Sequence, residues 1–137
     1  MLTAKRDILI EWGDCDPAGI VFYPRYFAWF DACTAGLFAH AGLPKPQMLK
    51  QYGIVGIPMV DTRAKFIVPS KFGDRVTVET RITEFRRSSF DVEHRLMKGD
   101  VLAIEAFETR VWVGRHPDDP DGIKAQAIPE EVMARFR

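Results

Sequence analysis

The sequence has little cysteine, no excess of charge of either sign, and no long hydrophobic run. Its two cysteines, Cys15 and Cys33, are too few for a disulfide framework. With no signal peptide in view, they favour a cytoplasmic protein. Basic and acidic residues balance at 19 each, whereas a general nucleic-acid binder normally carries a basic excess. No stretch reaches the ~20 apolar residues of a membrane span. We therefore expect neither nucleic-acid nor membrane binding.

Metal-ligand spacing is also absent. The three histidines, His40, His94 and His116, stand far apart and have no paired cysteines beside them, so no metal cofactor is expected. What the chain does have is a large apolar fraction, 47% of 137 residues. That is enough to bury a full core in a single domain spanning residues 1–137.

The residue pattern predicts one long helix early in the chain. It begins near Pro24, a residue tolerated in a first helical turn, and runs to about Ala41, where Gly42 ends it. Past the first turn its only acidic or basic side chain is Asp31, apart from the titratable His40. Because a helix that is apolar around most of its circumference must be covered, we expect burial on nearly every side.

Most of the remaining chain favours strands. Alternation of apolar and polar residues is typical of half-buried antiparallel strands. The predicted strands are Lys5–Trp12, Met59–Val68, Arg75–Thr83, Phe90–Leu96 and the less regular Val101–Val113. His116–Gly122 is predicted to be a polar surface loop. The fold class is therefore α+β, with a curved antiparallel sheet around one long central helix, and the partly polar outer face of the sheet favours a homo-oligomer.

A long motif then carries a family resemblance. The run from Trp12 to Tyr26, with the turn Gly13-Asp14-Cys15-Asp16-Pro17-Ala18-Gly19, resembles the 4-hydroxybenzoyl-CoA thioesterase branch of the hotdog-fold acyl-CoA thioesterases. The resemblance continues through Gly53–Pro58 and Glu84–Phe90 and covers nearly the whole chain. It implies a hotdog fold, in which a five-stranded antiparallel sheet wraps the helix. It also implies hydrolysis of an aromatic acyl-CoA, 4-hydroxybenzoyl-CoA, without a metal or redox cofactor. Homodimers, often paired into homotetramers, would carry active sites at the subunit interface.

The resemblance assigns the reacting carboxylate to Asp16, as a nucleophile or as a general base, and the sequence leaves these two roles open. The alternative is that Asp16 only caps the turn before Pro17. Asp14 is expected to bond turn amides instead. The amide of Tyr23 lies just before the helix, where the first N–H groups lack partners, and is the implied donor to the thioester oxygen.

The resemblance places the contacts to the CoA phosphates at Arg86, Arg87, Ser88 and Ser89. Arginines and hydroxyls suit phosphate groups, although an ordinary solvated hairpin turn would have the same composition. Ser88 departs from the branch, which carries a further lysine in this run, and Lys124 is a possible replacement.

Asp31 has two interpretations. A carboxylate on an apolar helix is costly unless it is paired, so it either contacts a polar substrate group such as a ring hydroxyl or pairs with Arg25 or another internal group. His94, on an apolar strand face, is expected to be a satisfied core histidine and not a catalyst. Cys15 and Cys33 are expected to be structural.

The sequence is also compatible with three other functions. A thioesterase for short aliphatic acyl-CoAs, of the branch associated with the Tol-Pal system, has a similar early motif. A hotdog dehydratase or hydratase needs a histidine near an acidic partner, whereas the helical His40 lies at the far end from Asp16. A non-catalytic acyl-CoA binding module would share most of the contacts of a thioesterase.

Overall fold

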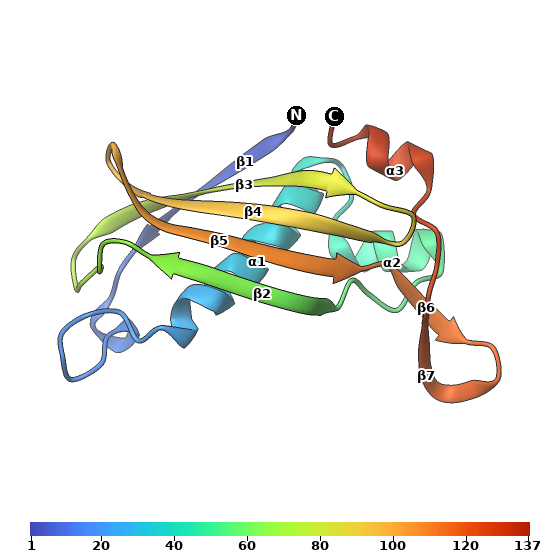
Figure 1. Cartoon of the computed structure of the whole chain (residues 1–137), viewed down its shortest axis with the longest axis horizontal. Coiled ribbons are helices and arrows are strands. Elements are labelled where there is room, and N and C mark those ends of the chain that lie inside the picture. Colours follow the sequence, from blue (N-terminus) through green and yellow to red (C-terminus); the bar gives the residue numbers. More distant parts are fainter.

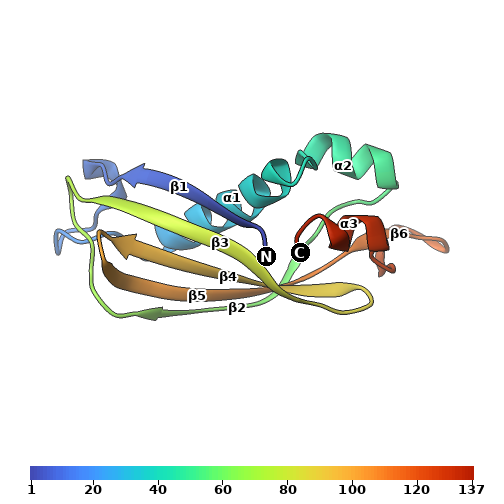
Figure 2. The same ribbon diagram turned by 90° about the horizontal axis from the view of Figure 1, so that it is seen from above.

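A computed structural model describes all 137 residues and contains a five-stranded antiparallel sheet in the order β1-β3-β4-β5-β2. The strands are β1 (Thr3–Leu9), β2 (Met59–Phe66), β3 (Arg75–Phe85), β4 (Ser89–Lys98) and β5 (Val101–Val111). The long helix α1 (Pro24–His40) crosses one face of this sheet (Figure 1), and the view from above shows helix and sheet as two layers (Figure 2). The predicted α+β class, the helix and the five strands are confirmed, with strand ends shifted by a few residues.

The packing of α1 explains its position. Its buried side chains recur at helical spacing and form one stripe, consisting of Tyr26, Phe30, Cys33, Thr34, Leu37 and Phe38. The prediction that the helix is buried on nearly every side is wrong for the single chain, because Ala28, Gly36 and Ala39 are exposed. The exposed positions of the helix hold either these small residues or Pro24, Arg25, Asp31 and His40, so they present little apolar surface to water.

The core divides along α1 into two clusters. Tyr26 and Phe30 of the first half pack with Val78 and Ile104 of the sheet. The second half packs against the opposite end of the sheet and the carboxyl-terminal segment; this cluster includes Leu37, Phe38, Phe90, Trp112 and Phe136. The amino end of α1 is therefore fixed at one end of the sheet and its carboxyl end at the other.

The outer face of the sheet is polar, as predicted. One row of side chains crosses all five strands in register with alternating charge, namely Lys5, Glu79, Arg95, Glu105 and Lys65. Opposite charges on neighbouring strands stabilise a sheet. Each acidic residue of this row thus lies between two basic ones.

Several short elements were not predicted. They are the 3-10 turn η1 (Trp12–Asp14), the helices α2 (Lys45–Tyr52) and α3 (Glu130–Ala134), and the strands β6 (Val113–His116) and β7 (Asp119–Ala125). The predicted loop His116–Gly122 is wrong in part, because β6 and β7 form a separate two-stranded hairpin that projects beyond the main sheet (Figure 1). Most of β7 is exposed, so the apolar alternation that marks a half-buried strand is missing. No helix has both the length and the apolar character needed to cross a membrane.

Candidate active site

The turn from Gly13 to Gly19 is a compact loop at the end of the sheet where β3 begins. Cys15 and Val21 form an isolated antiparallel bridge, and the N–H of Val21 donates to the carbonyl of Ser70 at 2.9 Å. Asp14 Oδ2 accepts the N–H of Glu11 at 2.9 Å, which confirms the predicted structural role of Asp14. Gly19 has a φ of +82°, a conformation that favours glycine. The backbone therefore fixes the loop.

Asp16 is half-buried at the tip of this loop. Its Oδ1 accepts the N–H of Ala18 at 2.8 Å, and its own N–H donates to the carbonyl of Ile20 at 2.9 Å. The turn-capping interpretation is thus correct for one carboxylate oxygen. The second oxygen accepts no hydrogen bond from the chain, so a catalytic role for it is compatible with the turn.

Tyr23 occupies the N-cap position of α1, immediately before Pro24. Its backbone N–H donates no hydrogen bond within the chain, while the next amides donate to Phe22 and Tyr23 carbonyls. The first amides of a helix also carry the positive end of its dipole. The Tyr23 amide is therefore free to bind an electron-rich oxygen. The Tyr23 residue is 62% exposed, and its ring lies 5.7 Å, between ring centroids, from that of Phe22.

Asp31 pairs with an internal group, although not with Arg25. Its Oδ1 accepts a hydrogen bond from Arg110 Nη2 at 2.8 Å, yet 59% of the Asp31 side chain remains exposed. It lines a cavity of about 410 Å³ together with Ile57, Met59 and Val113. Asp31 Oδ2 accepts no hydrogen bond, so pairing and substrate contact are compatible.

In the predicted phosphate-binding run, Arg86 and Ser89 have side chains that are hydrogen-bonded within the chain, whereas Arg87 and Ser88 do not. Arg86 donates to both carboxylate oxygens of Asp91 at 2.7 and 3.0 Å, and its Nε donates to Ser89 Oγ at 2.8 Å. The Arg86 guanidinium holds the pKa of Asp91 below its ordinary value. The side chains of Arg87 and Ser88 have no hydrogen-bond partner, and their carbonyls accept from Ile128 and Trp112 respectively.

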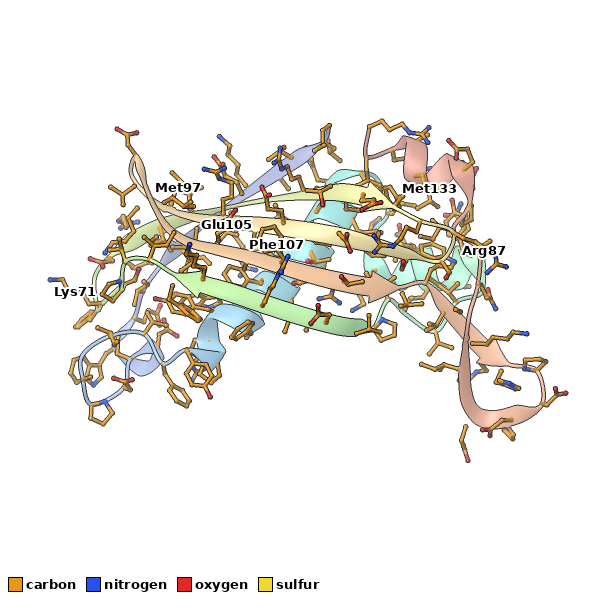
Figure 3. All side chains as sticks on the ribbon, viewed as in Figure 1. Lys71, Arg87, Met97, Glu105, Phe107 and Met133 are labelled. Carbon is orange, nitrogen blue, oxygen red and sulfur yellow. The ribbon has the colours of Figure 1, made fainter.

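The predicted site residues form two groups rather than one. Asp16 and Tyr23 belong to the loop that pairs with Lys71 through Ile20, whereas Arg87 lies at the opposite end of the sheet (Figure 3). Asp31 is tied to that opposite end, because Arg110 stands beside Phe90 in the sheet register. A single chain therefore does not bring the two groups together.

A buried polar network was missed in the sequence. His94, which is fully buried, bonds to Thr80 at 2.8 Å and to Glu108 at 2.9 Å, and Glu108 bonds to Arg110 at 2.7 Å. This confirms His94 as a satisfied core histidine. The inward position of Glu108 and Arg110 could have been predicted from the sequence of β5, because these residues continue the inward alternation of Ile104 and Ala106.

Burial of Glu108 opposes its ionisation, but hydrogen bonds from His94 and Arg110 outweigh this effect and hold the pKa of the carboxyl below its ordinary value. No group of three or more His, Cys, Asp or Glu side chains is placed to hold a metal ion. The available chemistry lies in the free oxygens of Asp16 and Asp31 and in the free amide of Tyr23.

Residues 10–136 match the family model of the thioesterase-like superfamily. The chain is a member of the thioesterase-like superfamily. A 4-hydroxybenzoyl-CoA thioesterase from Pseudomonas sp. (strain CBS-3) is 40% identical to this superfamily member over 130 residues, which cover 90% of each chain.

Solved structures of thioesterases share the fold of this superfamily member. A mutant 4-hydroxybenzoyl CoA thioesterase complexed with 4-hydroxybenzoyl CoA superposes with a TM-score of 0.90 at 34% identity, covering 98% of this chain and 99% of the other. A gentisyl-coenzyme A thioesterase superposes with a TM-score of 0.81 at 30% identity, covering 97% and 98% of the two chains. These neighbours establish that the α+β arrangement is the hotdog fold.

Proposed function

We propose that this chain, as one hotdog domain over residues 1–137, hydrolyses an aromatic acyl-CoA, with 4-hydroxybenzoyl-CoA the preferred substrate. The observation that carries the proposal is that two groups of the segment from Asp16 to Tyr23 have no partner in the chain, the second carboxylate oxygen of Asp16 and the amide of Tyr23. One supplies a nucleophile or base, and the other supplies an oxyanion donor. The similarity to a 4-hydroxybenzoyl-CoA thioesterase supports the acyl group.

The reaction follows from these groups. The Tyr23 N–H binds the thioester oxygen and stabilises the negative charge that develops on it. Asp16 either attacks the carbonyl carbon, giving an acyl-aspartyl anhydride that water then hydrolyses, or removes a proton from an attacking water. In both routes the C–S bond breaks, the thiolate of CoA leaves and takes up a proton, and the carboxylic acid is released.

The two halves of the site meet when two copies associate. Strand β2 pairs only with β5, and almost its whole length is exposed, including the apolar Val60 and Phe66. An exposed apolar edge strand is a template for another strand. Antiparallel pairing of β2 with β2 of a second copy places the Met59 end of one strand against the Phe66 end of the other. The Asp16 loop of one copy then faces the Asp31 cavity and Arg87 of its partner.

Within this interface, Arg87 and Ser88 are the residues we assign to the CoA phosphates, because their side chains have no partner in the chain. Arg86 and Ser89 support the turn through their mutual hydrogen bond and the pair with Asp91. Asp31 Oδ2 accepts a hydrogen bond from the ring hydroxyl of the acyl group. The assembly is a cytoplasmic homodimer, or two such dimers forming a homotetramer.

Mixed dimers test the shared site directly. Asp16→Asn and Arg87→Glu variants are each expected to have low activity below saturation. If each site takes Asp16 from one copy and Arg87 from the other, a mixed dimer has one intact site and one doubly altered site. Mixing the unfolded variants in equal amounts and refolding them should therefore restore about a quarter of the wild-type activity for random dimers. No recovery on mixing would show that each chain carries its whole site.

A panel of acyl-CoAs tests the reaction and the acyl group. The panel contains 4-hydroxybenzoyl-CoA, benzoyl-CoA, a short aliphatic acyl-CoA and an enoyl-CoA, and release of free thiol is measured. We expect the largest kcat/KM with 4-hydroxybenzoyl-CoA. Hydration of the enoyl-CoA without thiol release would identify a hydratase instead, and binding without turnover would identify a binding module.

A further inference from the structure

Each of the three guanidinium nitrogens of Arg110 donates a hydrogen bond within the chain. Its Nε donates to Glu108 Oε1 at 2.7 Å, its Nη1 to the carbonyl of Ile57 at 3.1 Å, and its Nη2 to Asp31 Oδ1 at 2.8 Å. Only 5% of the side chain is exposed. A planar group held at three points cannot rotate to follow a mobile partner. Arg110 therefore sets the position of the Asp31 carboxylate, and not the reverse.

Glu108, which accepts the Nε–H of Arg110, is itself part of the core. Thr34 Oγ1 donates to Glu108 Oε1 at 2.8 Å, and His94 Nε2 lies 2.9 Å from Glu108 Oε2. His94 is stacked on Phe30 of α1, with ring centroids 4.8 Å apart, and its other nitrogen bonds to a threonine of β3. Both oxygens of Glu108 are thus occupied from α1 and β4. The Arg110–Glu108 pair is therefore a rigid support for Asp31, and Arg110 lines the same cavity as Asp31.

We propose that Arg110 and Glu108 are positioning residues for acyl-group specificity, which hold Asp31 as a fixed, negatively charged acceptor at the wall of the 410 Å³ cavity. The cavity then accepts acyl groups that end in a hydrogen-bond donor, such as a phenolic hydroxyl or an amine. It rejects groups that only accept hydrogen bonds and groups that carry a negative charge. This inference rests on the proposed hydrolysis of an aromatic acyl-CoA.

The charges of the cluster support this selectivity. The charges of Glu108 and Arg110 cancel, so the hydrogen-bonded cluster of Asp31, Arg110 and Glu108 carries one negative charge, which would repel a negatively charged acyl group beside Asp31. Lys45 also lines the cavity but forms no ion pair with Asp31. Apart from Arg110, the remaining wall is apolar and consists of Val55, Gly56, Ile57, Pro58, Met59, Val113 and Ile123. In such surroundings an acceptor that meets no donor is left unsatisfied, which costs binding free energy.

Four CoA thioesters and two variants test the inference. The acyl groups are 4-hydroxybenzoyl, benzoyl, 4-methoxybenzoyl and 4-carboxybenzoyl, and the wild type should prefer them in that order. The double variant Arg110→Met/Glu108→Gln removes the buried ion pair but leaves Thr34 and His94 a polar partner. Its ratio of kcat/KM for 4-hydroxybenzoyl-CoA over benzoyl-CoA should fall about tenfold or more, the value of one charged hydrogen bond. A general loss of cavity shape would instead lower kcat/KM for both substrates together and leave the ratio unchanged.

The conservative variant and a control separate positioning from general damage. Arg110→Lys retains the charge but not the three-point attachment, so its ratio should lie between those of the wild type and the double variant. Arg81→Met breaks another Arg–Glu pair, 3.0 Å long, on the outer face of the sheet, and should leave the ratio unchanged.

The outcomes distinguish this inference from the proposed function. A wild type without preference for the hydroxylated acyl group would remove 4-hydroxybenzoyl-CoA as the substrate. If the wild type prefers the hydroxylated acyl group and the folded double variant keeps that preference, the proposed role of Arg110 is wrong. The proposed function would not be affected by that result. If the double variant does not fold, Arg110→Lys tests the role of Arg110 instead. An unchanged ratio of kcat/KM for 4-hydroxybenzoyl-CoA over benzoyl-CoA in that variant would overturn the inference.

Discussion

Asp16 and Asp31 lie in the two separate halves of the proposed site, and they are held in different ways. The Asp16 carboxylate takes one hydrogen bond, from an amide two residues away in its own loop. The Asp31 carboxylate takes one from Arg110, whose partners lie in the buried core. At the first end the backbone provides the geometry, and at the second end side chains provide it. We therefore expect substitutions at the Asp16 end to remove chemistry while sparing the fold, and substitutions at the Asp31 end to change selectivity and stability together.

Asp16→Asn should have the largest effect on activity. Asparagine keeps an oxygen that can accept the Ala18 N–H, but it loses the charge and the nucleophilic oxygen. Turnover should fall at least ~100-fold, the lower end expected for a general base, while the unfolding midpoint and CoA affinity persist. Rapid-quench kinetics on the wild type would also show whether an acyl-enzyme accumulates. Asp14→Asn is the matched control, and near-normal turnover in Asp16→Asn would transfer the assignment to another group.

The same difference between local and long-range contacts explains which features could be predicted from the sequence. The five strands and α1 were predictable because each has one buried face, and a buried face leaves a period of two or of 3.6 in the sequence. The hairpin β6–β7 was not, because most of β7 is exposed. The structural role of Asp14 was predictable because a turn confines its hydrogen bonds to nearby residues.

Long-range pairing could not be predicted in this way. Arg110 is 79 residues from Asp31 in sequence, and only the sheet register places them together. In the same way, the run Arg86 to Ser89 could be predicted as one polar turn, but not the division of its side chains between Asp91 and solvent. That division depends on a strand position five residues away from Arg86.

At the phosphate-binding end, Arg86 and Arg87 provide the next comparison. Arg87→Ala removes a free guanidinium, so it should raise KM for the acyl-CoA about tenfold, the value of a charged hydrogen bond, with kcat nearly unchanged. Arg86→Ala should raise KM less, because that side chain is already committed to Asp91. An acyl thioester of a truncated thiol supplies the second measurement, since it has no phosphates. If Arg87→Ala affects both substrates equally, the residue does not hold the phosphates.

The smallest expected effect is on stability and depends on pH. The hydrogen bonds from Arg86, together with one from Thr109 at 2.9 Å, hold the pKa of Asp91 below its ordinary value of 3.8. A carboxyl whose pKa is lower in the folded state adds stability above its unfolded pKa, and that stability is lost as the pH falls through the folded pKa. Arg86→Ala lets the pKa of Asp91 rise, so the variant should lose less stability on acidification than the wild type.

Because the Arg86–Asp91 pair is partly exposed, with 40% and 29% of the two side chains accessible, the loss at neutral pH should be less than about 1 kcal/mol. Urea unfolding at pH 7 and at pH 3 measures it: the difference in stability between wild type and Arg86→Ala should be smaller at pH 3 than at pH 7. Arg87→Ala is the matched control, because its side chain has no partner, and it should follow the wild type at both pH values. A constant gap between wild type and Arg86→Ala would mean that the arginine acts by packing its aliphatic stem and not by charge. Its kinetic effect on CoA binding would then have to come from displacement of the neighbouring turn residues, which would weaken the division between committed and free arginines.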